Sequence, residues 1–93
     1  MPVKRCILNG QVIRSLDDLY DQLVSRLSLP AHFGRNLDAL WDVLSTEVAG
    51  PFKIVWKHAD DSKKLMGSDF NRVVKLFQGL EKERDDFQLA IEP

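Results

Sequence analysis

Hydrophobic residues recur along this chain at two spacings, one typical of strands and one typical of helices. Alternation of hydrophobic and polar positions predicts strands at residues 5–9, 52–57 and 87–91. In the first of these, Cys6 and Leu8 point to the same face. We therefore expect each strand to bury one face and to leave the other partly exposed to water.

Spacings of three and four residues predict helices between these strands. Ser15 is placed to cap the first helix, which is expected to end at Leu29 because a residue before proline avoids the helical region. A short helical turn is predicted at residues 61–66, and Ser68 is predicted to cap a long last helix. The predicted buried stripes are Leu16, Leu19, Tyr20, Leu23 and Leu27 in the first helix, and Phe70, Val73, Val74, Phe77 and Leu80 in the last.

A further helix is predicted after Asn36, which is placed to cap it. Its apolar stripe consists of Leu37, Leu40, Trp41, Leu44 and Val48. Asp38 and Asp42 lie one turn apart on the flank of this stripe. Two like charges at this spacing cost an isolated helix about 0.2–0.5 kcal/mol. A cationic partner outside the chain would compensate for that repulsion.

These polar residues also have ordinary structural explanations. Asp38 falls in the first turn of its helix, where the helix dipole favours an acid by roughly 0.3–1 kcal/mol. Asp42 lies a full turn further on, and its default role is that of an exposed, solubilising carboxylate. Trp41, at the border of the stripe, is more often a core residue than a contact residue. The spacing alone therefore leaves the function open.

The order of the predicted elements indicates an α/β domain. Each strand is separated from the next by a helix, so the three strands are expected to be parallel. Parallel sheets that are covered on both faces are usually hydrophobic throughout, whereas these strands alternate. We therefore expect a two-layer arrangement with three to four helices on one face of a three-stranded sheet. The pattern does not specify the order of the strands.

Composition narrows the possible functions. The 93 residues, 44% of them hydrophobic and 29% charged, are expected to form one globular domain spanning residues 1–93. The net charge of −1 argues against a dedicated nucleic-acid binder, which usually carries a basic excess. Cys6 is the single cysteine, which excludes an internal disulfide and leaves too few thiols for a metal site. The N-terminus has no apolar run long enough for a signal peptide or a membrane span, which predicts a cytoplasmic protein.

The segment GRNLDALWDVL, from Gly34 to Leu44, closely resembles the one that characterises the barstar family of ribonuclease inhibitors. The preceding residues 29–33, LPAHF, extend the resemblance. Further matches lie at residues 7–19 (ILNGQVIRSLDDL), at Pro51 and Trp56, and at residues 73–77. The resemblance covers nearly the whole chain, which makes it more specific than any short motif.

In this family, as the resemblance implies, the acidic helix and the loop before it block the active site of a barnase-like, secreted microbial ribonuclease. Acidic side chains then stand in for RNA phosphate, and the family's contact positions fall on His32, Asp38, Trp41 and Asp42. The resemblance implies a bacterial immunity protein or antitoxin that is a monomer, binds a protein and needs no cofactor. It implies neither an enzyme nor a partner that is a nucleic acid or a membrane.

Three positions depart from the family pattern and bear on the choice of partner. Thr46 and Glu47 stand where a small residue and a second aromatic are familiar. Gly79 stands where the last helix of the family can contribute another contact acid, a role that Glu81 or Glu83 could take. We expect Thr46 and Glu47 to face the partner, and the cognate enzyme to differ at the rim of its active site.

Two other functions compete with inhibition. An enzyme would use His32 with Asp38 or Asp42 as an acid–base pair, but the chain has no recognisable nucleophile elbow, phosphate loop or metal triad. A barstar-fold binding module with a partner other than a ribonuclease is the stronger alternative, because a fold does not determine a function.

Overall fold

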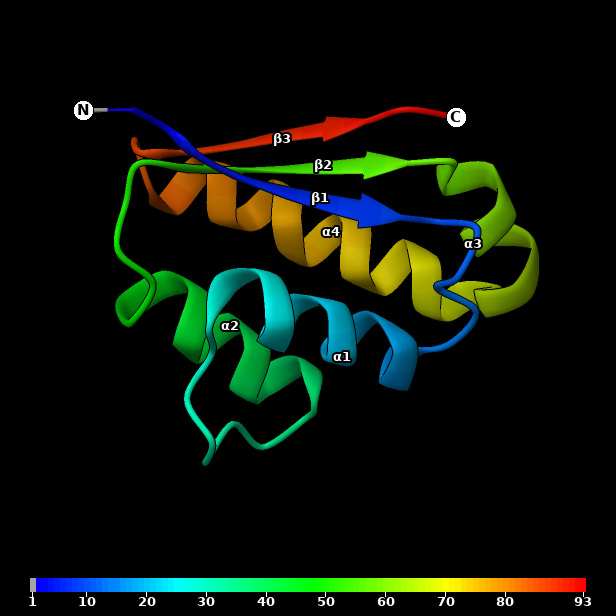
Figure 1. The fold of residues 1–93 in the computed structure, drawn as a ribbon, viewed down its shortest axis with the longest axis horizontal. Coiled ribbons are helices and arrows are strands. Elements are labelled where there is room, and N and C mark those ends of the chain that lie inside the picture. Colours follow the sequence, from blue (N-terminus) through cyan, green and yellow to red (C-terminus); the bar gives the residue numbers. More distant parts are fainter. Residues whose placement is uncertain (1) are drawn as a thin grey trace.

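The computed structural model describes residues 2–93, which form one three-stranded sheet and four helices (Figure 1). In chain order the elements are β1 (Lys4–Asn9), α1 (Leu16–Leu27), α2 (Leu37–Thr46), β2 (Phe52–Lys57), α3 (Ala59–Met66), α4 (Ser68–Glu83) and β3 (Phe87–Ile91). The predicted α/β class is confirmed. All three predicted strands are present, the first beginning one residue earlier than expected.

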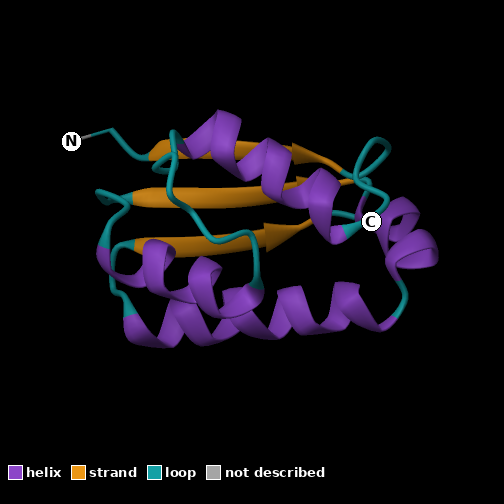
Figure 2. Ribbon diagram, turned by 90° about the horizontal axis from the view of Figure 1, so that it is seen from below, coloured by secondary structure: helices purple, strands orange, loops and turns teal. Residues whose placement is uncertain are grey.

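The strands are parallel and lie side by side in the order β1-β2-β3. Cys6 pairs with Ile54, which pairs in turn with Leu89. Helices α1 and α4 pack against one face of the sheet, and α2 lies farther from the sheet beside α4 (Figures 1 and 2). Helix α3 lies at the end of the sheet where the strands terminate. Helices α1, α2 and α4 therefore lie on one side of the sheet, as the alternating strands predict.

The first two helices begin where their capping side chains predict. Ser15 Oγ accepts a hydrogen bond from the backbone N–H of Asp18 at 3.2 Å. Asn36 Oδ1 accepts one from the backbone N–H of Ala39 at 2.8 Å. Each bond satisfies one of the backbone donors that a helix leaves free in its first turn. Both predicted caps are confirmed.

The end of α1 is set by backbone conformation rather than by the following proline. α1 ends at Leu27, two residues before the predicted end at Leu29. Ser28 adopts a left-handed conformation with φ of 53°, and its N–H donates to the carbonyl of Val24. This residue closes the last turn in the manner of a left-handed helix cap. The chain has therefore left the helix before it reaches Pro30.

The segment between β2 and α4 differs from the prediction in two ways. The short turn predicted at residues 61–66 is the eight-residue helix α3, which begins at Ala59. Ser68 does not cap α4 but is its first helical residue, preceded by Gly67 with φ of 60°. Glycine adopts this conformation without the steric cost of a Cβ atom. The link between the two helices therefore needs no side-chain cap.

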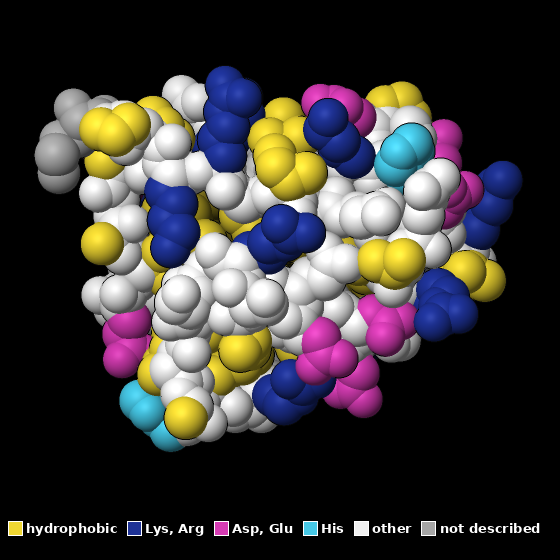
Figure 3. Space-filling model, in the orientation of Figure 1, with side chains coloured by type: hydrophobic (Ala, Val, Ile, Leu, Met, Phe, Trp, Pro, Cys, Tyr) yellow, Lys and Arg dark blue, Asp and Glu magenta, His cyan; other side chains and the backbone are white. Residues whose placement is uncertain are grey.

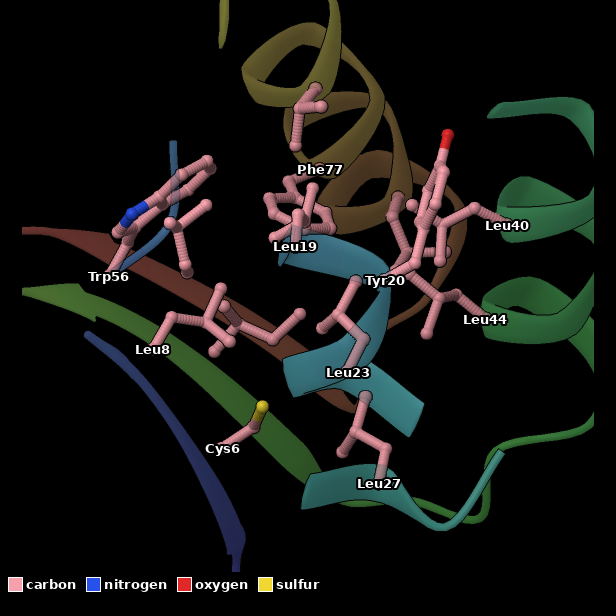
Figure 4. Close-up of a cluster of buried hydrophobic side chains, with 14 of the residues drawn as sticks. Cys6, Leu8, Leu19, Tyr20, Leu23, Leu27, Leu40, Leu44, Trp56 and Phe77 are labelled. Carbon is pink, nitrogen blue, oxygen red and sulfur yellow. The ribbon is translucent and has the colours of Figure 1, made fainter. Parts of the chain in front are cut away.

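The inner face of the sheet and the facing sides of the helices form one hydrophobic core (Figure 4). Cys6 and Leu8 project from β1 into this core, as the alternation predicts. Trp56 is fully buried, and its ring centroid lies 6.3 Å from that of Phe77. Burial raises the pKa of the Cys6 thiol to about 11, so this side chain behaves as a small hydrophobic group.

Each outer strand of the sheet has one amide that is satisfied by a helix side chain. Gln22 Oε1 accepts a hydrogen bond from Asn9 N–H at 3.2 Å. Glu81 Oε2 accepts one from Leu89 N–H at 3.0 Å. Such bonds cover backbone groups that an edge strand otherwise exposes. Glu81 is therefore engaged at β3.

Candidate protein-binding site

Helix α2 buries a face that is turned further toward the preceding loop than predicted. Leu40 and Leu44 are fully buried, as expected. Val43 is only 3% exposed although it lies outside the predicted stripe, and it faces the loop between α1 and α2. The remaining stripe residues, Leu37, Trp41 and Val48, are half-buried against the same core. Periodicity within a helix cannot show on which side a loop will pack, so the stripe was wrong at Val43.

The two aspartates of α2 are exposed on the side of the helix that faces away from the core. Within residues 2–93, neither carboxylate takes part in an ion pair or accepts a hydrogen bond. The helix itself is held by its Asn36 cap and its buried face. Asp38 and Asp42 are thus fixed in place by the backbone while their charges remain available.

A shallow cavity of about 220 Å³ lies between α2 and the loop before it. Its less exposed lining residues are Pro30, Phe33, Ala39 and Val43, which form an apolar floor. Three exposed polar residues, His32, Asp42 and Glu47, lie around this floor. The structure therefore brings together three of the predicted site residues, one from the loop, one from the middle of α2 and one from its C-terminal end.

Trp41 lies on the other side of α2, against α4. The nearest atoms to a Cβ built on Gly79 would be two ring carbons of Trp41, at 3.5 and 3.7 Å. The half-buried indole therefore crosses α4 at the one glycine of that helix. Trp41 connects the acidic flank of α2 to α4, and it does not line the cavity beside Asp42.

The remaining predicted residues differ in how free their polar groups are. Thr46 is exposed, but its hydroxyl donates to the carbonyl of Asp42 at 2.6 Å and so completes the last turn of α2. Glu83 is exposed one turn after Gly79, on the same side of α4. Because Glu81 bonds to β3, Glu83 is the better placed of the two acids to act near Trp41.

The C-terminal end of α2 is held by an arginine that comes 38 positions after Thr46 in the chain. Arg84 donates from one terminal nitrogen to the carbonyls of Leu44 and Val48, at 2.7 and 2.8 Å. Its Nε and its other terminal nitrogen each donate to the carboxylate of Asp86 at 2.8 Å. The guanidinium carbon also lies 4.9 Å from the ring centroid of Phe52. We call this set of contacts the Arg84 clamp.

The Arg84 clamp was not predicted. The sequence places Arg84 near the C-terminus of its own helix, where a basic residue is common, but its carbonyl partners belong to α2 and to the residues after it. Gly50 shows how closely the chain packs here, since a Cβ on it would overlap with the carboxylate of Asp86. Hydrogen bonds from Arg84 lower the pKa of Asp86 below its ordinary value of 3.8.

Neither a metal centre nor a membrane span is found in the part of the chain that the structure describes. Residues 2–93 contain no group of three or more His, Cys, Asp and Glu side chains arranged to hold a metal ion. No helix among them combines the length and the apolar character that a bilayer crossing requires.

Comparison with known proteins gives two findings. Residues 3–92 match the family model described as Barstar (barnase inhibitor). The chain is also 34% identical over 91 residues to a Bacillus subtilis (strain 168) protein named "Putative ribonuclease inhibitor YrdF". That match covers 97% of this chain and 100% of the relative. Both similarities extend over the loop, α2 and α4.

Proposed function

The chain belongs to the Barstar family, and from this premise we propose that it inhibits a barnase-like microbial ribonuclease. In this proposal α2 and the preceding loop cover the active site of the enzyme, where acidic side chains replace RNA phosphate. The observation that carries the proposal is the pair Asp38 and Asp42. Both carboxylates are exposed on a helix with a buried face, and neither is paired within residues 2–93.

The chemistry of a ribonuclease cleft fits this surface. Such a cleft presents Arg, Lys and His side chains toward phosphate, so its potential is positive. Carboxylates on a rigid helix are complementary to it and accelerate the encounter by long-range attraction. A carboxylate and a guanidinium can also form a bidentate, charge-assisted pair. We assign Asp42 the central contact and Asp38 the neighbouring one, with His32 and Trp41 on either side.

Glu47 gives the site its own character. It adds a second carboxylate to the cavity that Asp42 and His32 line, at a position where an aromatic residue is familiar in the family. An additional acid favours a target with an additional cation, because specificity arises from matching and mismatching charges at an interface. We propose that the cognate enzyme carries a basic residue opposite Glu47, and that Thr46 faces the same part of its rim.

The proposed mechanism is occlusion without catalysis. The buried face of α2 and the Arg84 clamp fix the helix before binding, so little ordering is needed when the partner arrives. No cofactor takes part, and one copy of the chain is sufficient to cover one active site. We place the inhibitor in the cytoplasm, because a cell that makes a secreted ribonuclease needs protection there before export.

Titration of ribonuclease activity tests this function. Wild-type protein and the Asp42→Ala variant would be titrated against a panel of barnase-like enzymes, including any encoded by a neighbouring gene. Loss of Asp42 should weaken inhibition by about 2–5 kcal/mol, or roughly 30- to 5,000-fold, which is the general cost of truncating one partner of a buried charge pair at an interface. Asp60→Ala is the control, because it removes the same charge from an exposed position on α3.

The second candidate function is a binding module of the same fold with a partner other than a ribonuclease. Glu47 and Gly79 favour it, because both depart from the family at positions where a partner would be selected. Failure of folded wild-type protein to inhibit any enzyme of the panel would overturn the ribonuclease proposal and support this one. An equal loss of inhibition in Asp42→Ala and Asp60→Ala would contradict a central role for Asp42.

A further inference from the structure

The loop between α1 and α2, residues 28–36, packs on the rest of the protein mainly through Leu29 and Phe33, with the half-buried Pro30 between them. Leu29 is buried with an exposed fraction of 7%. Phe33 packs edge-on against Tyr20 of α1, with ring centroids 5.5 Å apart and planes at 80°. Between and after these anchors, Ala31, His32 and residues 34–36 are exposed. Apolar packing therefore does not by itself account for the conformation of the segment that carries His32.

Arg35 supplies a third attachment, through charge. One of its terminal nitrogens donates to Asp21 Oδ1 at 2.9 Å, to the backbone carbonyl of Asp17 at 3.2 Å and to Asp17 Oδ1 at 3.4 Å. The guanidinium carbon lies 5.6 Å from the ring centroid of Tyr20. Asp17 and Asp21 are one turn apart on α1, so a single cation relieves the repulsion between them. Acidic side chains gather over α1 on the face that Figure 3 shows.

The backbone of Arg35 has an uncommon conformation, which the contacts of its side chain help to maintain. Its φ is 50°, in the left-handed region that residues other than glycine seldom occupy. Such a conformation persists where the surroundings fix it. The next residue is Asn36, the cap of α2. Arg35 therefore joins the loop to α1 immediately before the residue that caps α2.

The side chain of Arg35 lies apart from the cavity that His32 and Asp42 line. That cavity is lined by Gly34 but not by Arg35. Arg35 instead lines a separate surface groove with Tyr20 and Asn36, between the N-terminal ends of α1 and α2. Any effect of Arg35 on the His32 cavity therefore passes through the backbone of the loop or through Tyr20, whose ring packs against Phe33 at the floor of that cavity.

We propose that Arg35 is a positioning residue for the binding site: its contacts with Asp17 and Asp21, here called the Arg35 clasp, hold the loop in the conformation that presents His32 to the partner. The proposal rests on the proposed function and adds a residue that makes no required contact with the enzyme. It also predicts that removal of Arg35 changes the affinity for the enzyme in the direction opposite to the one expected from charge alone. A cation beside a surface that meets a cationic cleft opposes binding, so removal of Arg35 strengthens binding by charge alone and weakens it if the Arg35 clasp orders the loop.

Hydrogen exchange in the free protein tests the ordering step. Backbone amides of residues 31–35 should exchange faster in Arg35→Gln and in Asp21→Asn than in the wild type, while amides of the sheet remain unchanged. Arg35→Lys should give an intermediate rate, because lysine keeps the charge but cannot present the arginine fork. Arg72→Gln is the matched control, since it removes an exposed arginine that pairs with Asp69 on α4. Unchanged exchange in the loop would overturn the proposal.

Association and dissociation rates with an inhibited ribonuclease test the consequence. Arg35→Gln and Asp21→Asn should each weaken inhibition roughly 2- to 12-fold, the cost of ordering about one side chain on binding. Arg35→Gln alone separates ordering from charge, because loss of the acid in Asp21→Asn by itself also weakens binding to a cationic cleft. The double variant should lose less than the sum of the two single losses, because both changes remove one shared contact. Tighter or unchanged binding by Arg35→Gln would overturn the Arg35 clasp while leaving the proposed function intact. Absence of any inhibition by the wild type would overturn both the proposed function and the role of the Arg35 clasp in binding. The wild type is therefore measured first, before any variant is compared with it.

Discussion

Two arginines hold the two ends of the acidic helix, and their surroundings differ. At the C-terminal end, the side chain of Arg84 is 14% exposed and bonds to two backbone carbonyls as well as to Asp86. At the N-terminal end, the side chain of Arg35 is 40% exposed, and both of its carboxylate partners on α1 are more exposed still. Arg84 therefore bonds to partly buried backbone groups, whereas Arg35 bonds to carboxylates that water can reach.

This difference separates stability of the fold from order in the binding loop. If Arg84 is removed, the carbonyls of Leu44 and Val48 lose their donors in partly buried surroundings, where an unsatisfied carbonyl destabilises the fold. If Arg35 is removed, Asp17 and Asp21 simply return to solvent, and exposed ion pairs contribute little to folding. The same type of side chain thus stabilises the whole molecule at one end of α2 and orders a local segment at the other.

The largest expected effect is that of Arg84→Ala on unfolding. Two carbonyls left without donors should lower the free energy of unfolding by about 2–4 kcal/mol. Urea denaturation with Arg35→Ala alongside checks the contrast, because the midpoint of Arg35→Ala should not move measurably. Equal shifts for the two variants would remove the distinction between the Arg84 clamp and the Arg35 clasp.

A substitution that leaves Arg84 in place should reach the same contacts. In Gly50→Ala the new Cβ would overlap with Asp86 Oδ2 and would lie 3.0 Å from a terminal nitrogen of Arg84, so the carboxylate must move. We expect a loss of about 1–3 kcal/mol, as for other overpacked positions. Since both changes disturb one set of bonds, Gly50→Ala and Arg84→Ala combined should cost less than their sum. Full additivity in urea denaturation would show that Gly50 acts independently of the clamp.

Acid should weaken the Arg84 clamp in a defined direction. The hydrogen bonds from Arg84 lower the pKa of Asp86 in the folded protein below its ordinary value of 3.8. A carboxylate whose pKa is lower in the folded than in the unfolded protein stabilises the fold in full when the pH is above the unfolded-state pKa. This contribution is lost as the pH falls from about 4 through the folded-state pKa. Urea midpoints measured from pH 6 to pH 2 should therefore differ between wild type and Asp86→Asn at high pH and converge at low pH. A constant difference would contradict this titration.

The sequence predicts those parts of the fold in which a strand or helix buries one of its faces and exposes the other. Alternation in β1, β2 and β3 identifies the strands because one face of each meets the core, and Ser15 and Asn36 mark helix starts through a single local bond each. Strand order could not be predicted, since the same inward-facing residues suit any order. Ser68 was predicted to cap α4 because serine is a common capping residue. The structure instead begins the helix at Ser68, after a turn made by the positive φ of Gly67.

The candidate site was predictable only through resemblance to a family. Asp38 and Asp42 have ordinary explanations as helix residues, and nothing in their spacing places His32 and Glu47 around the same cavity. The two arginines were missed for a related reason. Arg84 bonds to carbonyls 36 and 40 positions away, and Arg35 to carboxylates 14 and 18 positions away, so no local pattern records either contact.

The smallest expected effect lies between the two ends of α2, where Trp41 crosses Gly79. A glycine inside a helix destabilises it by roughly 0.5–1 kcal/mol relative to alanine. The Cβ of Gly79→Ala would meet the indole at 3.5 Å, which is ordinary van der Waals contact. We therefore expect Gly79→Ala to raise the free energy of unfolding by that amount in urea denaturation, with inhibition unchanged.

Gly79→Glu separates the stability of this contact from its part in recognition. It should keep the stabilising Cβ and add an acid beside Trp41, at the position where the family's last helix can supply one. If the target presents a cation there, inhibition should strengthen relative to Gly79→Ala; if Glu83 already occupies that role, the two variants should inhibit equally. A loss of stability in Gly79→Ala would instead mean that the indole of Trp41 cannot tolerate the added methyl group.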